Sequence, residues 1–311
     1  MEHCRVRVAE VEGEGLYPNL MGDYDMKPSR FAYACPRTVD DALALLAQHG
    51  DETKILAGGQ SLVPLLNLRM ANVNALVDVN RLTELSFVSR ENGMLHVGAL
   101  TRHRQLEVSE DANTVLPLLS RAAVEVGHLA IRNRGTIGGS LVHADPAAEW
   151  PLVAVVLDAQ LVLRSQNGTR TVAARDFFLA PLTTAIEPNE LLCEIRFPVA
   201  PHPVAWGFQE FCRRPGDFAI AAVACQLAFD ENRTCTAVSL AVGGAHSTPL
   251  LVTEVEKALK GTRGEETNLR QAAEIAAASV EPPSDVHGSS EYRRRLVKVL
   301  TVRALKEAWN K

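Results

Sequence analysis

Two short segments of this 311-residue chain combine adjacent glycines with a serine shortly after them: AGGQS at residues 57–61 and TIGGS at residues 136–140. Glycine tolerates positive φ and lets backbone N–H groups converge into a concave nest that binds phosphate oxygens. Two such nests suit a pyrophosphate, and each net hydrogen bond contributes about 1 kcal/mol, or more to a charged oxygen. Taken alone, either loop is also explained as a turn at the end of a strand.

The common nucleotide and metal motifs are missing from the sequence. Neither loop fits GxGxxG or GxxxxGK[ST], so a Rossmann NAD site and a P-loop are not supported. The six cysteines contain no CxxC pair, and the nine histidines have no HExxH or similar spacing. We therefore predict no metal site and no iron–sulfur cluster within this chain, and reduced, structural cysteines.

Composition and charge exclude several classes of protein. The chain is 47% hydrophobic and 22% charged, which is typical of globular proteins with two or three packed units. A net charge of -5, without a basic run interleaved with aromatics, argues against nucleic-acid binding. The longest strongly apolar segment, residues 218–229, is too short to span a membrane, and the acidic start lacks an export signal. We expect a cytoplasmic protein.

The first half of the chain predicts two units that would position the glycine loops. Residues 1–25 lack periodicity and are expected to form a loose extension or a strap, with order beginning near Met26. Residues 26–85 form a small α/β unit in which a helix runs from a cap at Thr38 to Gly50. Within this unit a strand leads into the first glycine turn, and a helical turn begins near Ser61.

Residues 86–198 predict the second unit. It contains the strands MLHVGAL and LLCEIRF, a helix capped near Thr101, a longer helix, and an apolar helix beyond Pro151. Asn167-Gly168 between two strand-like runs predicts a tight hairpin.

A proline-rich linker separates these units from residues 203–311. There, alternating apolar residues predict an antiparallel meander, and helices beginning near Thr253 and Ser289 complete an α+β domain.

Three stretches carry a family resemblance. LAGGQSLVPLLNLR, IRNRGTIGGSLVHADPAAEWP and RRPGDFA closely resemble the FAD-binding medium subunit of molybdenum hydroxylases, the xanthine dehydrogenase and carbon monoxide dehydrogenase family. The resemblance extends from Met26 to the C-terminus. It implies an α+β fold: a two-subdomain FAD-binding unit of the PCMH/VAO type, followed by a C-terminal α+β domain with a three-stranded antiparallel sheet.

The resemblance also implies a set of residues that contact FAD. The first pyrophosphate loop would be Ala57, Gly58, Gly59, Gln60, Ser61 and Leu62, and the second Thr136, Ile137, Gly138, Gly139 and Ser140. Further candidates along the flavin or in the same pocket are Ala99, Thr101, His143, Asp145, Glu149, Leu192, Gln209 and Phe218.

Several of these candidates have a second interpretation. Asp145 followed by Pro146 is typical of an N-cap and a first helical residue. Glu149 would hold the ribose or adenine side of the cofactor, or would be a carboxylate favoured by a helix dipole. Phe218 would cover the isoalloxazine or simply pack at the start of a strand. Gln209 stands where some relatives have a lysine, and a neutral amide stabilises a reduced flavin anion less than an ammonium does.

The leading hypothesis is a flavoprotein subunit of a molybdenum hydroxylase. In such assemblies a large subunit holds the molybdenum cofactor, a small subunit holds 2Fe-2S clusters, and FAD passes the electrons to NAD, oxygen or a quinone. A second hypothesis is a stand-alone FAD oxidase or dehydrogenase in which Phe218, Asp217 and Arg214 bound a substrate pocket and Asp217 is the base. A third is an interaction module that has lost its flavin.

Overall fold

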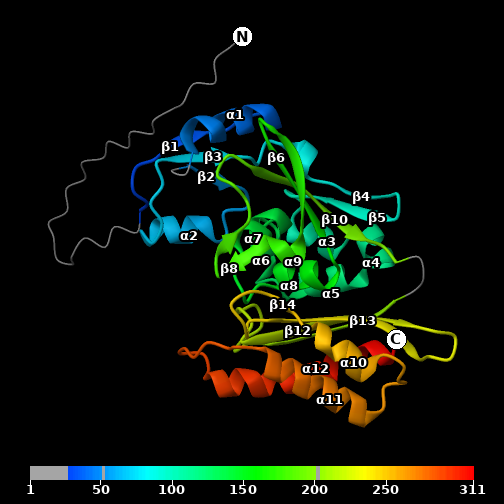
Figure 1. Cartoon of the computed structure of the whole chain (residues 1–311). Helices are drawn as coiled ribbons and strands as arrows, with labels where there is room; N and C mark the ends of the chain where they lie inside the picture. The colour runs from blue at the N-terminus through cyan, green and yellow to red at the C-terminus, as the bar shows by residue number, and fades with distance from the viewer. Residues whose placement is uncertain (1–26, 51–52, 201–203) are drawn as a thin grey trace.

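The computed structural model describes residues 27–50, 53–200 and 204–311 (Figure 1). The expected N-terminal extension, residues 1–25, and the expected start of order at Met26 lie outside the described residues. Within the described parts the chain forms three main sheets and a short two-stranded one, with helices between and around them. The α+β class is confirmed.

A small parallel sheet with strand order β1-β3-β2 begins the described chain. Its elements are β1 (Ala32–Ala34), α1 (Val39–His49), β2 (Thr53–Leu56), α2 (Leu62–Asn67), β3 (Ala75–Asp78) and the 3-10 helix η2 (Thr83–Leu85). As predicted, Thr38 caps α1, because its hydroxyl oxygen accepts a hydrogen bond of 3.1 Å from the backbone N–H of Asp41, and Gly50 ends the helix. The buried face of α1, including Leu43 and Leu46, belongs to one apolar cluster with Val77 of β3.

A five-stranded antiparallel sheet follows, with strand order β4-β5-β10-β6-β7. Its strands are β4 (Val88–Glu91), β5 (Met94–Gly98), β6 (Gln160–Ser165), β7 (Gly168–Ala173) and β10 (Leu191–Pro198). The predicted hairpin forms between β6 and β7, but Ser165 pairs with Gly168, so its turn residues are Gln166 and Asn167. The turn is therefore one residue earlier than the Asn-Gly pair indicated.

Seven helices and a short hairpin lie between β5 and β10 in the sequence. They are α3 (His103–Glu107), α4 (Glu110–Val115), α5 (Pro117–Glu125), α6 (Leu129–Arg132), α7 (Ile137–His143), α8 (Glu149–Val156), α9 (Ala174–Phe177), β8 (Phe178–Ala180) and β9 (Thr183–Thr184). All eight residues of α8 are buried. A helix that is apolar on nearly every side must be covered on every side, and α8 packs against α5, α7 and the C-terminal sheet.

The C-terminal sheet has one strand more than expected. The resemblance implied three strands, whereas the sheet has four in the order β11-β12-β13-β14: β11 (Ala205–Phe211), β12 (Ala221–Phe229), β13 (Cys235–Gly243) and β14 (Leu250–Leu251). The fourth strand is only two residues long and pairs with Ala241 and Val242. A segment this short has no detectable alternation, so the sequence gives no signal for it.

Helices cover both faces of this sheet (Figure 1). One face packs against α11 (Glu266–Ser279) and α12 (Ser290–Trp309), which follow η3 (Thr253–Val255) and α10 (Glu256–Leu259). The other face packs against α5 and α8. The last helix, α12, begins near Ser289 as predicted, with Ser289 as its N-cap, whereas α11 was not foreseen as a separate helix. No helix in the described ranges is long and apolar enough to cross a membrane.

Candidate cofactor site

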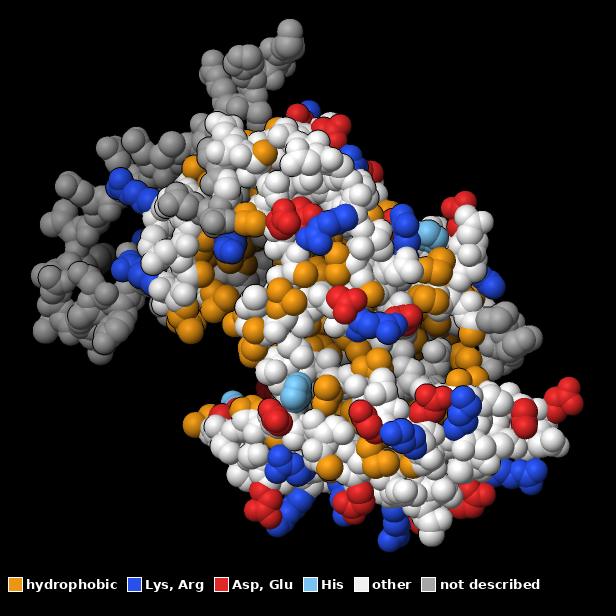
Figure 2. Space-filling model, viewed as in Figure 1, with side chains coloured by type: hydrophobic (Ala, Val, Ile, Leu, Met, Phe, Trp, Pro, Cys, Tyr) orange, Lys and Arg blue, Asp and Glu red, His pale blue; other side chains and the backbone are white. Residues whose placement is uncertain are grey.

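A cavity of about 580 Å³ lies where the two glycine loops meet. Its walls come from β2, the first loop, the second loop, the start of α8, β10 and the β11–β12 loop. In the space-filling view the molecule is hollowed between its N-terminal part and the C-terminal layer, and hydrophobic side chains gather on the upper wall of the hollow (Figure 2). The cavity therefore brings together segments from all three sheets.

The first glycine loop, residues 57–61, connects β2 to α2 and presents unused backbone donors. Gly59 has a φ of 72°, in the left-handed region, and is followed by Ser61 in the right-handed helical region. Within the described chain, the N–H groups of residues 58–61 have no recorded hydrogen-bond acceptor. Successive backbone N–H groups left free in a turn with a left-handed residue are typical of an anion-binding nest.

The second glycine loop, residues 136–140, differs from the first because its N–H groups are already bonded within the protein. The N–H of Gly138 donates to Ala99 O at 2.9 Å, that of Gly139 to Thr136 Oγ1 at 3.0 Å, and that of Ser140 to Thr136 O at 3.1 Å. Thr136 is the N-cap of α7. In the described chain the two loops therefore differ as donors, because the N–H groups of residues 58–61 have no recorded acceptor whereas those of residues 137–140 are bonded within the protein.

Glycine is required in both loops because the backbone of each touches a neighbour. A Cβ on Gly58 would lie 2.4 Å from Arg134 O and 2.6 Å from Gly135 Cα, in the segment that leads into the second loop. A Cβ on Gly138 would lie 2.6 Å from both the Cβ and the O of Ala99. The glycines thus allow the two loops to approach each other and the sheet behind them.

A polar clamp of two side chains, Asn80 and Arg102, holds the loops together. Asn80 Nδ2 donates to Ala57 O at 2.7 Å, and Asn80 Oδ1 accepts from the Arg102 guanidinium at 2.7 Å. The same guanidinium donates to Arg134 O. Burial, and then the nearby charge of Arg134, lower the pKa of Arg102. The clamp links the residue that opens the first loop to the segment before the second.

Most of the residues implied by the resemblance line this cavity, and three do not. Thr101 is buried and its hydroxyl donates to Phe87 O at 2.9 Å. Ile137 is fully buried in the apolar core. Gln209 lies on β11, where its amide donates to Glu307 at 3.0 Å. The lining residues from the expected set are Ala57, Gly58, Gly59, Gln60, Ser61, Leu62, Ala99, Thr136, Gly138, Gly139, Ser140, His143, Asp145, Glu149, Leu192 and Phe218. Asp217, the candidate base of the stand-alone hypothesis, also lines the cavity.

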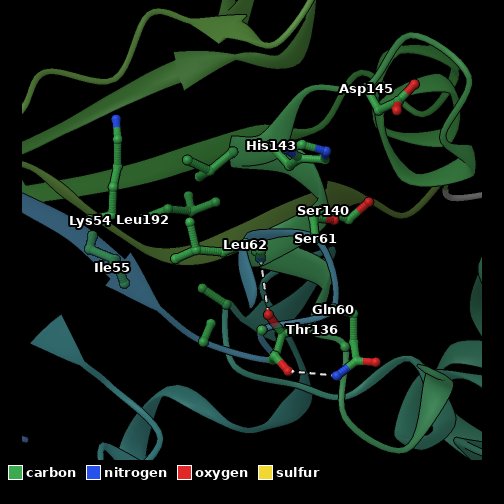
Figure 3. Close-up of a pocket in the computed structure, with 18 of the residues that line it drawn as sticks. Lys54, Ile55, Gln60, Ser61, Leu62, Thr136, Ser140, His143, Asp145 and Leu192 are labelled. Carbon is green, nitrogen blue, oxygen red and sulfur yellow. Dashed lines mark hydrogen bonds between the residues drawn. The ribbon is translucent and has the colours of Figure 1, made fainter. Parts of the chain in front are cut away.

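The close-up shows how the labelled side chains are spread along the cavity (Figure 3). Lys54 and Ile55 of β2 lie toward one end and Asp145 lies toward the other, with Ser61, Ser140 and Thr136 between them. Lys54 was missed by sequence reasoning, although its place in the strand directly before the first loop was a usable signal.

The segment after the second loop also differs from the sequence prediction. Asp145 was expected to cap a helix beginning at Pro146, but α8 begins at Glu149 with Ala148 as its N-cap. Asp145 instead caps a turn, in which its side chain accepts a hydrogen bond of 2.9 Å from the backbone N–H of Ala147. The turn ends two residues before the helix, so the Asp-Pro pair marks a tight bend rather than the helix start.

Buried acids lie behind this segment. Glu149 is 5% exposed, and burial raises its pKa to about 7, with the carboxylates of Glu125 and Asp145 acting in the same direction. Burial also raises the pKa of Glu210, on β11, to about 9, and Glu149 and Glu125 add to this while Arg121 opposes it. Glu210 Oε2 is buried without a recorded partner in the described chain. The cluster favours protonated carboxyl groups near neutral pH.

The β11–β12 loop supplies the last wall. Gly216, Asp217 and Phe218 line the cavity, and the Phe218 side chain is 61% exposed. Such exposure contradicts the interpretation of Phe218 as a core packing residue and leaves its ring at the cavity edge. Arg213 and Arg214 belong to the same loop but do not line the cavity.

The cavity fits a dinucleotide better than a metal ion. A nest of free N–H groups, hydroxyls at Ser61 and Ser140, and apolar walls suit phosphates together with flat rings. In the ranges that the structure describes, no three His, Cys, Asp or Glu side chains are grouped as metal ligands.

Comparison with known proteins gives two family matches that together cover most of the chain. Residues 29–200 match the FAD binding domain in molybdopterin dehydrogenase. Residues 206–308 match the CO dehydrogenase flavoprotein C-terminal domain. The fold type implied by the resemblance is thereby confirmed, apart from the extra strand.

The alignments with individual relatives cover nearly the whole length of each relative. The 6-hydroxypseudooxynicotine dehydrogenase complex subunit alpha of Paenarthrobacter nicotinovorans is 41% identical over 283 residues, covering 91% of this chain and 96% of its own. The carbon monoxide dehydrogenase medium chain of Hydrogenophaga pseudoflava is 36% identical over 284 residues, covering 91% and 99%. A solved carbon monoxide dehydrogenase from H. pseudoflava superposes with a TM-score of 0.88 at 36% identity, over 91% of this chain and 98% of that one.

Proposed function

This chain belongs to the family of FAD-binding medium subunits of molybdenum hydroxylases, and from that premise we propose that the cavity between its two glycine loops holds FAD and passes electrons to an acceptor. The chain is an oxidoreductase subunit of the flavoprotein type. The observation that carries the proposal is that residues 58–61, whose N–H groups have no recorded acceptor in the described chain, line a cavity of about 580 Å³.

Each wall has a role in this proposal. The first loop binds the pyrophosphate through its free N–H groups, and the hydroxyls of Ser61 and Ser140 add donors. Glu149 and Asp145 accept hydrogen bonds from sugar hydroxyls. Phe218 lies at the cavity edge, where it limits access to the ring system. Bound FAD supplies redox chemistry that accepts electrons singly or in pairs, while the protein orients it and excludes water.

The partners of the chain are part of the same proposal. The relatives are named as an alpha subunit of a dehydrogenase complex and as a medium chain, so they work within multi-subunit enzymes. We propose a large subunit with the molybdenum cofactor and a small subunit with 2Fe-2S clusters. The absence of cluster-type cysteine spacing from this sequence supports clusters on another chain. NAD, oxygen or a quinone is the proposed acceptor.

A visible spectrum of the purified chain tests the cofactor. We expect a flavin spectrum, release of FAD on denaturation, and no reduction of this FAD by organic substrates added to the chain alone. Purification with the neighbouring subunits should add molybdenum and iron and make the FAD reducible by the substrate of the complex. A colourless chain that binds no added FAD would overturn the proposal.

The stand-alone oxidase is the other outcome of this experiment. If the isolated chain turned over a metabolite, replacing Asp217 with Asn would show whether that carboxylate is the base. Full turnover by the D217N variant would remove that role.

A further inference from the structure

His103 is a buried histidine at the start of α3 that lines the cavity, although it belongs to no sequence motif. It is 4% exposed and lies between Trp150, the second residue of α8, and Gly135, directly before the second loop. Its backbone N–H donates to Gly135 O at 3.1 Å. Both the backbone and the ring of His103 therefore contact the entry to the second loop.

Trp150 determines which nitrogen of His103 accepts a hydrogen bond. The indole Nε1 lies 3.0 Å from His103 Nδ1, and the two rings stack with centroids 5.8 Å apart and an interplanar angle of 24°. The indole N–H is a donor only, so His103 Nδ1 must accept. In a neutral imidazole the ring proton is then on Nε2.

The environment of His103 keeps it neutral. Burial, and then the positive charges of Arg102 and Arg132, lower the pKa of His103 to about 3. At neutral pH the side chain is therefore an uncharged donor, with Nε2–H as its only N–H group.

The Nε2 atom faces the approach to the second loop. A Cβ on Gly135 would lie 2.6 Å from His103 Nε2, so only glycine leaves room for the ring there. For the described residues, no protein acceptor is recorded for Nε2, although the side chain is buried and lines the cavity. A ligand that excludes water from the cavity must therefore supply an acceptor for this N–H, because a donor left unpaired costs about 1–3 kcal/mol.

We propose that His103 donates its Nε2–H to a phosphate oxygen of the bound dinucleotide, and that Trp150 is the positioning residue that fixes the required tautomer. This inference rests on the proposed function. The second loop supports it, because the N–H groups of Gly138, Gly139 and Ser140 are already bonded within the protein. An oxygen on that side of the cavity needs a donor from elsewhere, and His103 Nε2 lies beside the residue that leads into this loop.

The test compares two substitutions of His103 in the full chain after removal of bound flavin. Asn keeps an acceptor near Nδ1 for Trp150 and lacks a donor near Nε2, whereas the longer Gln places an amide N–H near Nε2. We expect H103N to weaken FAD and ADP binding by about 10- to 100-fold, as for a hydrogen bond to a charged group. Riboflavin, which has no phosphate, should bind H103N and the native chain equally, and H103Q should recover most of the FAD affinity.

A spectroscopic measurement on the native chain keeps the proposal testable if H103N does not fold. In chain labelled with ¹⁵N-histidine, we expect the Nε2–H tautomer of His103 between about pH 5 and 8, and a shift of its Nε2 proton on FAD binding. In the W150F variant this tautomer should mix with the Nδ1–H form, because the fixed donor to Nδ1 is gone.

Three results would overturn the inference: an unchanged FAD affinity of H103N, an equal loss for FAD and riboflavin, or an Nε2 proton that does not respond to FAD. These outcomes are distinct from failure of the proposed function. In that case the native chain itself would bind no FAD, although its His103 tautomer would still be measurable.

Discussion

The two glycine loops share a sequence pattern but differ in which of their groups remain free. The first loop, residues 57–61, has unbonded N–H groups and a serine that makes no capping hydrogen bond. The second, residues 136–140, has its N–H groups bonded to Ala99 and Thr136 and forms the first turn of α7. The same residue types thus leave backbone donors free in one loop and form the start of a helix in the other.

This difference predicts that changes in the two loops affect different properties, cofactor affinity in one case and folding stability in the other. A change in the first loop should mainly reduce cofactor binding, because those groups have no role in the fold without the cofactor. A change in the second loop should mainly reduce folding stability, because its hydrogen bonds are within the protein. The contact between the loops, at Gly58, should affect both.

Substitution of Gly58 with Ala is expected to have the largest effect. Its Cβ would overlap the backbone at Arg134 and Gly135, which cannot move aside as a flexible side chain would. We expect FAD binding to weaken by about 10- to 100-fold, measured by flavin fluorescence titration, since overpacking of this kind costs about 1–3 kcal/mol. Gly243 is the matched control, because its Cβ would meet nothing closer than 3.5 Å. Equal affinities of the two variants would contradict the close approach.

Replacing Asn80 with Ala removes the link between the two loops. It leaves Ala57 O without its donor and the Arg102 guanidinium without one acceptor. The expected losses are about 1–3 kcal/mol of unfolding free energy and about tenfold in FAD affinity. Urea denaturation and FAD titration measure them, with N113A on the exposed surface of α4 as the control. If N80A behaved like N113A, the loops would not need the clamp.

The acids behind the second loop give a pH test. The pKa of Glu210 is raised to about 9 in the folded chain, above about 4.3 in an unfolded one. Between these values the folded state holds a proton that the unfolded state has lost, so stability should fall as pH rises from about 5 to 9. The E210Q variant should lose part of this fall, gaining on the order of 2 kcal/mol relative to the native chain at pH 8.5 compared with pH 5. Urea denaturation at both pH values measures it.

The pH test has a control variant and a result that would contradict it. Glu254 is exposed on η3, so E254Q should show the same pH dependence as the native chain. Parallel curves for E210Q and the native chain would mean that Glu210 does not retain its proton.

Removing one hydroxyl from each loop should have the smallest effects and compares the two loops most directly. Thr136 accepts a hydrogen bond from the N–H of Gly139, so T136A should reduce the unfolding free energy by about 1–2 kcal/mol. Ser61 makes no capping bond, so S61A should leave stability nearly unchanged and weaken FAD binding by about three- to tenfold. Denaturation of the FAD-free chain and FAD titration of both variants measure the difference. Similar effects of both substitutions on stability would remove the distinction between the loops.

Local signals predicted the elements around the site well. The cap at Thr38, the stop at Gly50, the strand before the first loop and the helix start near Ser289 were all predicted from a few adjacent residues, and the structure confirms them. Such features depend on interactions between residues close together in the sequence, so they can be predicted from local patterns.

Features that depend on distant partners were not predictable in the same way. The bonding of the second loop requires Ala99, which lies far away in the sequence. Thr101 and Ile137 were expected at the cofactor, and Gln209 near the flavin, yet their side chains face Phe87, the core and Glu307. His103 carries no motif, and only its packing against Trp150 and Gly135 draws attention to it.

The C-terminal sheet, covered by helices on both faces, constrains how this protein can diversify. Its β11–β12 loop forms one wall of the cavity, while the sheet packs on α5 and α8 of the preceding unit. A recombination point in the linker near residue 200 would therefore divide both an apolar interface and a binding wall. We therefore expect the C-terminal domain and the preceding unit to vary together in sequence. Substitutions at residues 216–218, at the tip of the β11–β12 hairpin, can change access to the cavity without altering either glycine loop.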